Sequence, residues 1–399
     1  MDKTFKLFYL FFTLFFYGAY GSTHTGGKKQ CEAPKRILIF CDMWEDHRMA
    51  VGGTEMVVCA VRDGLRKRGH DVRLMGFADV TTYKIPFMDE NYFAWPFFMD
   101  GVIKKKIKEF NPHHIFIPLL GTISNAAARY CAAHDIPFTA FYSILGTEFF
   151  TASTGMPLWF SRSFIHKFLC KATNIVVPTD SARSHAAQEG FANAITWPHG
   201  VDQERFTMPA AEEKAMAVKA CGLEGKPRPY YLFVGRVSEE KNFSAFLQAK
   251  VAGTKVVVGK EGRGFSINRL KKEYPDIVFA GKQVGPDLVK YYHAADIFLF
   301  PSKLDTFGLV MLEALSCGAP VVGFNTYGLC DVVPQGCGVS YLANSLDSIA
   351  ELEACAGQAW SDLQSGVVTP EKCRAYASKF SWSSAIEQLQ QVLVPTGLA

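Results

Sequence analysis

Two carboxylates in the stretch from Ile297 to Phe324 occupy positions that its apolar pattern does not require. The stretch predicts a strand that ends at Phe300, a polar loop, and a helix that opens near Phe307. Asp305 falls in the loop, and Glu313 interrupts the apolar run of the helix. Because eight residues advance about 80° beyond two full helical turns, the two acids converge only if Asp305 lies off the helix, over its N-terminus.

This arrangement predicts a binding site for a sugar nucleotide. The backbone N–H groups of Phe307, Gly308 and Leu309 suit a phosphate, since the N-terminus of a helix favours anions. The carboxylates of Asp305 and Glu313 suit the hydroxyl groups of a sugar and of a ribose. Each acid alone also has an ordinary interpretation, in which Asp305 caps the helix and Glu313 is solvated on its outer face.

The segment D-T-F-G-L-V-M-L-E-A-L-S-C-G-A-P-V-V-G resembles the donor-site signature of family-4 glycosyltransferases of the GT-B fold. In that signature two acids bracket seven residues, F-G follows the first acid, and E-A-x-x-x-G-x-P-V follows the second. The resemblance implies that Asp305 contacts a hydroxyl of the donor sugar and that Glu313 binds the ribose. The first acid is usually Glu in the family, so the shorter Asp305 leaves the identity of the donor sugar open.

A pair of cations follows the first strand of the second half. The segment G-R-V-S-E-E-K-N, which begins at Gly235, resembles the phosphate-binding G-R-x-x-x-x-K-G of the same family. The resemblance implies that Arg236 and Lys241 neutralise the diphosphate, together with the helix that follows Gly308. No D-x-D motif is present to hold Mg²⁺, so we expect neither a metal nor a cofactor. The ordinary alternative is a solvated turn.

The first half opens with a strand, a glycine loop and a helix. Gly52 and Gly53, in V-G-G-T-E, would allow the backbone to approach a ligand closely, as in nucleotide-binding folds. An ordinary tight turn between strand and helix explains the same residues. The passage GGTEMVVCAVRDGLRKRGHDV resembles the first unit of family-4 glycosyltransferases.

Weaker signals occur in the middle of the chain. Gly259, Lys282 and Val284 are candidates for the pocket of the nucleotide base. The segment W-P-H-G-V-D, residues 197–202, resembles the family's P-N-G-V-D hinge, with His199 in the place of Asn. We interpret His199 as structural.

Strand-length apolar runs alternate with helical patterns in both halves, which predicts parallel, doubly wound sheets. The resemblance implies the GT-B fold, in which two Rossmann-like α/β domains face a cleft. We expect the stretch from Ala375 to Val394 to be helical and to cross back onto the first domain. The expected segments are an N-terminal hydrophobic anchor or signal with a linker (1–34), an acceptor-side domain (35–202), a nucleotide-sugar-binding domain (203–374) and a crossover helix (375–399).

The composition excludes several classes of protein. The chain has 399 residues, 49% of them hydrophobic and 20% charged, which is enough for two globular domains. The formal charge of +4 is too small to indicate a nucleic-acid partner. Its 11 cysteines are odd in number and include no C-x-x-C, so we expect reduced thiols and no zinc site.

An apolar, Phe-rich run from Leu7 to Gly21 precedes the first strand. At about 15 residues it is short for a membrane span and close to the apolar core of a signal peptide. The basic residues on its C-terminal side outnumber those before it, which favours an anchor with a cytosolic catalytic body. A cleaved secretory signal is the alternative. Residues 102–110 and 157–170 are basic and amphipathic, which fits either a membrane surface or a helix facing the core.

The resemblance implies a hexosyltransferase that moves a sugar from GDP-mannose or a UDP-hexose to a hydroxyl group of a lipid or a glycan, with retention and without metal. Arg236, Lys241 and Asp305 would carry the catalysis. Many relatives have Tyr-His-Thr where this chain has Phe-Tyr-Ser ending at Ser143, so Ser143 or Glu148 would have to position the acceptor. The alternatives are a sugar-nucleotide epimerase of the same fold and a non-catalytic sugar-nucleotide-binding protein.

The apolar run from Leu7 to Gly21 leads us to expect that the full-length protein fractionates with membranes. A protein that begins at Lys35 should be soluble and should still bind its nucleotide sugar. Sedimentation of lysates that contain either form, followed by a nucleotide-binding assay, measures both properties. If the shortened protein sediments wholly with the membranes, attachment belongs to the later amphipathic segments instead.

Overall fold

The computed structural model describes residues 34–43, 52–80, 82–84, 92–94, 99–118, 121–142, 159, 166, 169–262, 264–326 and 328–393. The residues from Lys35 onward form one compact unit. The predicted N-terminal anchor, the acceptor-side candidates Ser143 and Glu148, and most of the basic stretch 157–170 lie outside the described residues.

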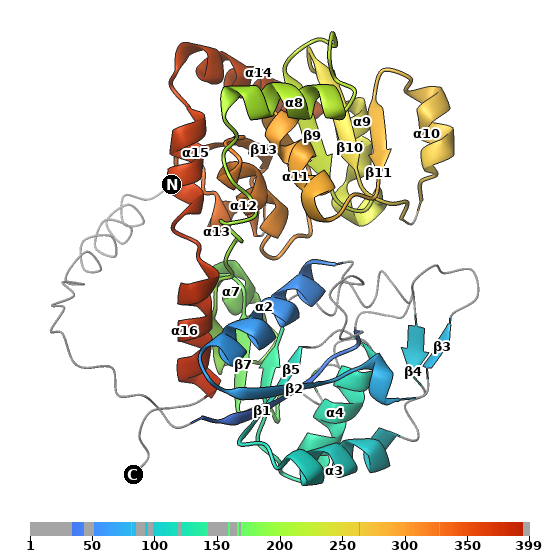
Figure 1. Cartoon of the computed structure of the whole chain (residues 1–399), viewed down its shortest axis with the longest axis vertical. Coiled ribbons are helices and arrows are strands. Elements are labelled where there is room, and N and C mark those ends of the chain that lie inside the picture. The colour runs from blue at the N-terminus through green and yellow to red at the C-terminus, as the bar shows by residue number, and fades with distance from the viewer. Residues whose placement is uncertain are drawn as a thin grey trace, which may run out of the picture. The chain divides into compact units, whose positions relative to one another are not determined.

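The first half of the compact unit is built on a six-stranded sheet whose paired strands are all parallel, in the order β2-β1-β5-β6-β7-β8 (Figure 1). Its strands are β1 (Arg36–Phe40), β2 (Asp71–Met75), β5 (His114–Pro118), β6 (Thr139–Phe141), β7 (Asn174–Val177) and β8 (Ala194–Thr196). Its helices are α2 (Gly53–Lys67), η2 (Phe77–Asp79), α3 (Met99–Phe110), α4 (Thr122–Ala133) and α7 (Asp180–Gln188). Strands β3 (Thr82–Lys84) and β4 (Tyr92–Ala94) form a separate antiparallel pair.

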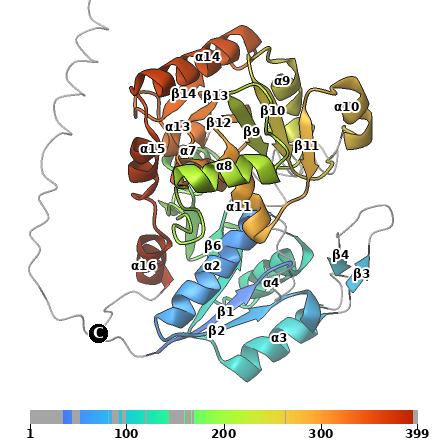
Figure 2. The same ribbon diagram turned by 45° about the horizontal axis from the view of Figure 1, so that its top comes forward.

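The second half contains another six-stranded parallel sheet, in the order β11-β10-β9-β12-β13-β14. Its strands are β9 (Tyr230–Val234), β10 (Thr254–Val258), β11 (Val278–Gly281), β12 (Ile297–Phe300), β13 (Val321–Phe324) and β14 (Ser340–Ala343). Its helices are α8 (Ala211–Ala220), η4 (Glu239–Lys241), α9 (Phe243–Gln248), α10 (Ile267–Glu273), α11 (Gly285–Ala294), α12 (Leu309–Ser316), α13 (Leu329–Val332), α14 (Ile349–Ser365) and α15 (Pro370–Ala377). Helices α8 and α11 lie side by side (Figure 2). The two sheets confirm the predicted α/β architecture with doubly wound parallel sheets.

Continuous apolar runs form the central strands of the second sheet. Every residue of β9 (YYLFV) and of β12 (IFLF) is buried, as expected for parallel strands covered by helices on both faces. The rings of Phe298 and Phe300 stack with centroids 5.5 Å apart, and the Phe233 ring lies 6.2 Å from that of Phe300. The loops that follow these two strands carry the candidate site residues, so a rigid aromatic core positions them.

The chain returns to the first sheet through helix α16 (Trp382–Leu393), which packs against α2 (Figure 1). Ile386 and Leu389 are buried in the same core cluster as Val61 of α2. The expected single helix from Ala375 to Val394 is wrong, because α15 ends at Ala377 and α16 begins at Trp382. Between the two helices the chain turns at Ser378 and Lys379, and the Phe380 carbonyl accepts a hydrogen bond from the N–H of Val201 at 3.0 Å.

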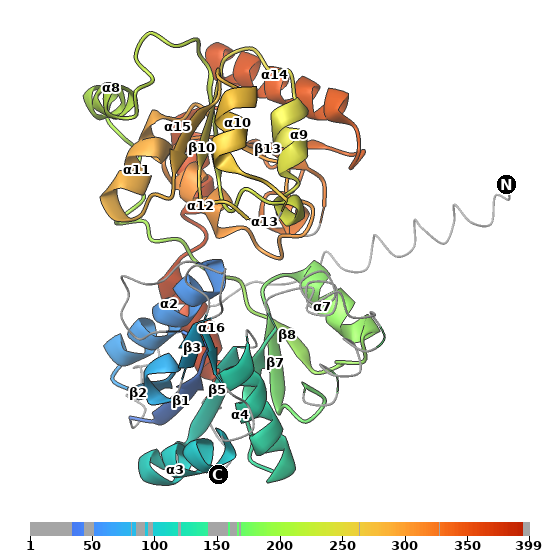
Figure 3. The same ribbon diagram turned by 90° about the vertical axis from the view of Figure 1, so that its right-hand side faces the viewer.

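Helix α3 turns the apolar face of its basic amphipathic pattern towards the first sheet, beside α4 (Figure 3). Ile103 and Phe110 are buried, and Ile107 packs against the same cluster. For this helix the core-facing interpretation is therefore correct. Within the described ranges, no helix is both long enough and apolar enough to cross a membrane.

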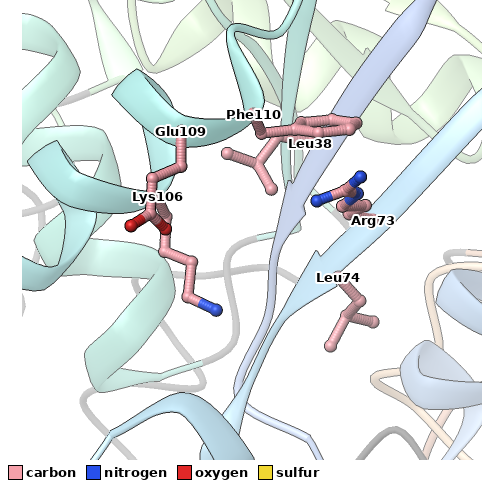
Figure 4. Close-up of a pocket in the computed structure, with 6 residues that line it drawn as sticks. All are labelled: Leu38, Arg73, Leu74, Lys106, Glu109 and Phe110. Atoms are coloured by element: carbon pink, nitrogen blue, oxygen red, sulfur yellow. The ribbon is translucent and has the colours of Figure 1, made fainter.

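A hollow beside α3 is one of the concave sites of the first half (Figure 4). It is lined by Leu38, Arg73, Leu74, Lys106, Glu109 and Phe110. The Arg73 guanidinium lies over the Phe110 ring at 4.5 Å, and Lys106 pairs with Asp79 at 2.5 Å. Both cations are thus engaged by protein groups, and the hollow contains none of the residues predicted to bind a sugar nucleotide.

We expect Gly200→Ala to destabilise the protein. A Cβ at Gly200 would lie 2.1 Å from the backbone nitrogen of Trp382, and neither backbone can yield as a side chain would. Overpacking of this kind typically costs about 1–3 kcal/mol. The matched control is Gly357→Ala in the exposed face of α14, where an added Cβ meets nothing within 4 Å. That change should stabilise the helix by about 0.5–1 kcal/mol. Thermal melting of both variants tests the pair, and equal melting temperatures would contradict this account of the crossing.

Candidate active site

Helix α12 begins at Leu309, two residues later than expected. The reason is Gly308, which has a left-handed backbone (φ 72°) and lies next to Met311, so that a Cβ there would be 2.6 Å from the Met311 Cε. Asp305 therefore lies off the helix, in the loop between β12 and α12, as the spacing of the acids predicts. Phe307 is buried in this loop. The N-terminus of α12 thus follows directly after the loop that contains Asp305.

Lys241 and Asp305 form an ion pair between the loops that follow β9 and β12. The Lys241 Nζ lies 2.9 and 2.7 Å from the two carboxylate oxygens of Asp305. Their side chains are only 22% and 17% exposed, so the pair is shielded from water more than an ordinary surface pair. The structure therefore brings together two of the three residues predicted to carry catalysis. The carboxylate of Asp305 is therefore paired with the Lys241 ammonium in this structure.

Arg236 lies on the same loop as Lys241 but has a different partner. Its guanidinium lies 3.3 Å from the Glu240 carboxylate, and the Arg236 side chain is half exposed. The preceding Gly235 has a φ of 153°, and a Cβ on Gly259 would lie 1.8 Å from the Gly235 carbonyl oxygen. The ends of β9 and β10 thus touch through backbone alone. This is the carboxyl edge of a parallel sheet, where open α/β sheets bind their ligands.

Glu313 is held by a tyrosine from a neighbouring helix. The hydroxyl of Tyr292 on α11 donates to Oε2 of Glu313 at 2.6 Å. Burial raises the pKa of the Glu313 carboxyl, whereas the Tyr292 hydrogen bond and the charge of Arg205 act in the opposite direction. The interpretation of Glu313 as a solvated surface residue is wrong. Among the residues that the structure describes, Tyr292 is the hydrogen-bond partner of the Glu313 carboxylate.

The candidates for the base pocket follow β10 and β11. Val284 is the residue before α11 and is 57% exposed. Lys282 is also exposed, and Gly259 lies at the end of β10. All three lie at the carboxyl edge of the second sheet, on the same edge as Arg236 and Lys241.

Gly52 and Gly53, which we expected to let the backbone approach a ligand, are engaged in the start of helix α2. Gly52 precedes α2, and its N–H donates to the carboxylate of Glu55, three residues further on. Gly53 is the first residue of the helix. The Gly52 N–H is therefore occupied within the chain. The signal was present in the sequence, since an acid three residues after a helix cap commonly reaches back to it.

His199 is buried among aromatic rings. The centroids of Trp197 and Phe307 lie 4.8 and 4.7 Å from that of His199, and the Trp382 ring stacks on it at 5.9 Å. Burial lowers the pKa of His199 to about 3, so the ring is neutral at physiological pH. Among the residues that the structure describes, its Nδ1 has no hydrogen-bond partner. The contacts agree with a structural role at the point where three segments meet.

Within the described part of the chain, no group of three or more His, Cys, Asp or Glu side chains is arranged to hold a metal ion. The cysteines described there are free thiols.

Comparison with protein families gives two matches. Residues 51–205 match the model described as Glycosyltransferase Family 4, and residues 228–362 match that described as Glycosyl transferases group 1. A GDP-mannose-dependent alpha-mannosyltransferase of Corynebacterium glutamicum is 24% identical over 326 residues, which cover 76% of this chain and 75% of that protein. A sulfoquinovosyl transferase of Arabidopsis thaliana is 24% identical over 85% of this chain and 66% of its own length.

Solved structures match both halves together. Sucrose-phosphate synthase from Thermosynechococcus elongatus superposes with a TM-score of 0.70 at 17% identity, covering 90% of this chain and 98% of that one. WaaG, a glycosyltransferase involved in lipopolysaccharide biosynthesis, gives 0.66 at 15% identity, covering 90% and 100%. At these identities the likeness shows the fold alone, and it confirms the predicted GT-B fold.

The site predicts different kinetic effects for its cation Lys241 and its partly buried acid Glu313. Lys241→Ala should lower the turnover of a donor nucleotide sugar about 10²-fold or more, with a smaller effect on donor affinity, because the charge is most valuable as the diphosphate departs. Glu313→Gln should mainly weaken the binding of donor and of free nucleotide, because a ribose contact persists into the transition state. Turnover, donor KM and nucleotide affinity measure both.

The matched control is Lys105→Ala, which removes an exposed lysine that pairs with Glu109 on α3. Its kinetics should equal those of the parent protein. Near-parental turnover in a Lys241→Ala protein that melts like the parent would remove the diphosphate role from Lys241.

Proposed function

We propose that this chain, which belongs to the family-4 glycosyltransferases and is a hexosyltransferase that uses a nucleotide sugar, transfers its hexose to a hydroxyl group of a lipid or a glycan. The proposed transfer retains the configuration at the anomeric carbon and requires no metal. GDP-mannose is the proposed donor, because three of the relatives compared are GDP-mannose-dependent mannosyltransferases. A UDP-hexose is the second candidate. The observation that carries the proposal is the ion pair between Lys241 and Asp305, which places a cation and a carboxylate at the N-terminus of α12.

The proposed step begins with an exchange of ionic partners. When the donor binds, Lys241 moves its ammonium from Asp305 to the diphosphate, and the half-exposed Arg236 supplies a second positive charge. Because a diphosphate carries more negative charge than one carboxylate, the exchange is electrostatically favourable. Asp305 is released at the same moment and is available to accept a hydrogen bond from a hydroxyl of the donor sugar.

Bond cleavage at the anomeric carbon follows from the same charges. The bond between that carbon and the phosphate oxygen breaks, and its electron pair stays on the diphosphate, where Lys241, Arg236 and the N–H groups of α12 stabilise it. The acceptor oxygen forms the new bond on the same face of the sugar. Its proton passes to the departing phosphate oxygen, so no protein nucleophile is required and the configuration is retained.

Two elements of the proposal rest on the sequence alone. The N-terminal apolar run, which lies outside the described residues, is proposed to attach the protein to a membrane with the catalytic body in the cytosol. Membrane attachment favours a lipid or lipid-linked acceptor. Ser143 and Glu148, also outside the described residues, are the proposed acceptor-side groups.

Incubation with labelled nucleotide sugars tests this function. The protein is mixed with GDP-mannose or a UDP-hexose, with and without a lipid extract, in excess EDTA or in MgCl₂. We expect the label to move to an acceptor from GDP-mannose, at similar rates with EDTA and with Mg²⁺. Loss of transfer in EDTA that Mg²⁺ restores would contradict the proposed charge neutralisation. Conversion of the donor without acceptor would instead identify an epimerase, and binding without turnover would identify a non-catalytic protein.

A further inference from the structure

Tyr292 is a buried tyrosine whose hydroxyl contacts an acid of the donor site. Its side chain has no exposed surface, and its hydroxyl donates to Oε2 of Glu313 at 2.6 Å. A buried tyrosine hydroxyl normally needs a hydrogen-bond partner, and Glu313 is the one that Tyr292 has among the described residues. The bond joins α11 to α12, two helices on either side of strand β12 in the sequence.

The Tyr292 ring is held firmly on its other side. Phe206, in the linker that follows residue 202, packs edge-to-face against it at 5.5 Å, and Phe298 of β12 lies 6.1 Å away. Close packing of this kind leaves a side chain one rotamer, so the position of its hydroxyl is fixed. A fixed donor on Oε2 restricts the rotation of the Glu313 carboxylate and therefore the direction in which Oε1 points.

The charges around Glu313 make this bond important for its ionisation. Burial favours the neutral acid, whereas Tyr292 and Arg205 favour the carboxylate. Asp202, at the start of the linker, acts against ionisation. Cys317, the residue after α12, is a neutral thiol, because burial raises its pKa far above the usual value. Arg205 is also tied to α11, since its Nη2 donates to the Gly285 carbonyl at 3.4 Å. The hydroxyl of Tyr292 is thus the direct hydrogen-bond donor that favours a charged Glu313.

We propose that Tyr292 is a positioning residue that orients the Glu313 carboxylate, and that it thereby sets the selectivity of the site for a ribonucleotide over a deoxyribonucleotide. The inference rests on the proposed function, in which the donor is a nucleotide sugar, and on the ribose-binding role that the sequence resemblance implies for Glu313. A carboxylate fixed in one orientation accepts from a correctly placed hydroxyl. The same carboxylate, when free to rotate or protonated, loses that preference.

Helix α11 gives this role a second consequence. Val284, a candidate for the base pocket, precedes the helix, and Tyr292 lies near its end. A single rigid helix therefore connects the residue proposed to contact the base with the one that orients the ribose acid. Helix α11 would then fix the contacts to both the base and the ribose of the nucleotide.

The test compares nucleotide selectivity in Tyr292→Phe and in the parent protein. Phe keeps the ring and its packing and removes the hydroxyl. We measure the dissociation constants of full-length protein for GDP, 2′-deoxy-GDP and 3′-deoxy-GDP, and for the uridine series in parallel. The parent should bind one deoxy form about 10- to 100-fold more weakly than the ribonucleotide, as expected for a hydrogen bond to a charged group. In Tyr292→Phe this preference should fall to within about threefold, with little change in the affinity for the deoxy form.

The matched control is Tyr341→Phe, which removes a tyrosine–carboxylate bond of 2.8 Å to Asp362 in the same half of the chain. It should keep the full preference. Tyr292→Phe should regain part of its preference as the pH rises, because a higher pH ionises Glu313 again. A role limited to packing predicts no such recovery. The double variant with Glu313→Gln should lose no more preference than Glu313→Gln alone, which checks that Tyr292 acts through Glu313.

Two results would overturn the inference. The first is a Tyr292→Phe protein that melts like the parent and keeps its full preference for the ribonucleotide. The second is a parent that binds ribo- and deoxyribonucleotides equally, which would leave the proposed function standing. A parent that binds no nucleoside diphosphate would overturn the proposed function as well.

Discussion

The ion pair between Lys241 and Asp305 connects the two loops on which the proposed donor site depends. One loop follows β9 and the other follows β12, and these strands are neighbours in the second sheet. Removing a charge from water is costly, so a shielded ammonium needs a partner with a negative charge. In this structure the partner is Asp305. In the proposed step a diphosphate, which carries more negative charge than one carboxylate, takes over the same ammonium.

Backbone contacts through glycine bring these loops close enough for the pair to form. A Cβ on Gly328 would lie 2.0 Å from the carbonyl oxygen of Asp305, so the chain before α13 packs directly against the Asp305 loop. A Cβ on Gly259 would clash in the same way with Gly235, the residue before Arg236. Larger residues at either glycine would push the charged loops outward. The electrostatics of the site therefore depend on close backbone packing at the sheet edge.

The strand, loop and helix around Asp305 could be predicted because their signals are local. An apolar run of strand length predicts β12, and the spacing of the two acids places Asp305 off α12. The partner of Lys241 could not be predicted in this way, since it depends on which strands are neighbours and lies 64 residues away. Tyr292 gives no signal either, because a tyrosine on the apolar face of a helix is typical of any core. The break between α15 and α16 was missed because it arises from pairing with Val201, far away in the sequence.

The two acids of the site differ in how their charge is balanced, and this difference suits their separate proposed tasks. Asp305 is balanced by a full positive charge on Lys241, which can leave when a diphosphate offers a better partner. Glu313 is balanced mainly by a neutral hydroxyl, and Tyr292 cannot follow a phosphate, because its ring is packed between Phe206 and Phe298. In the proposed step the first acid is set free by donor binding, whereas the second keeps one orientation throughout. A carboxylate released on binding suits the part of the donor that reacts, and a fixed one suits the part that only has to be recognised.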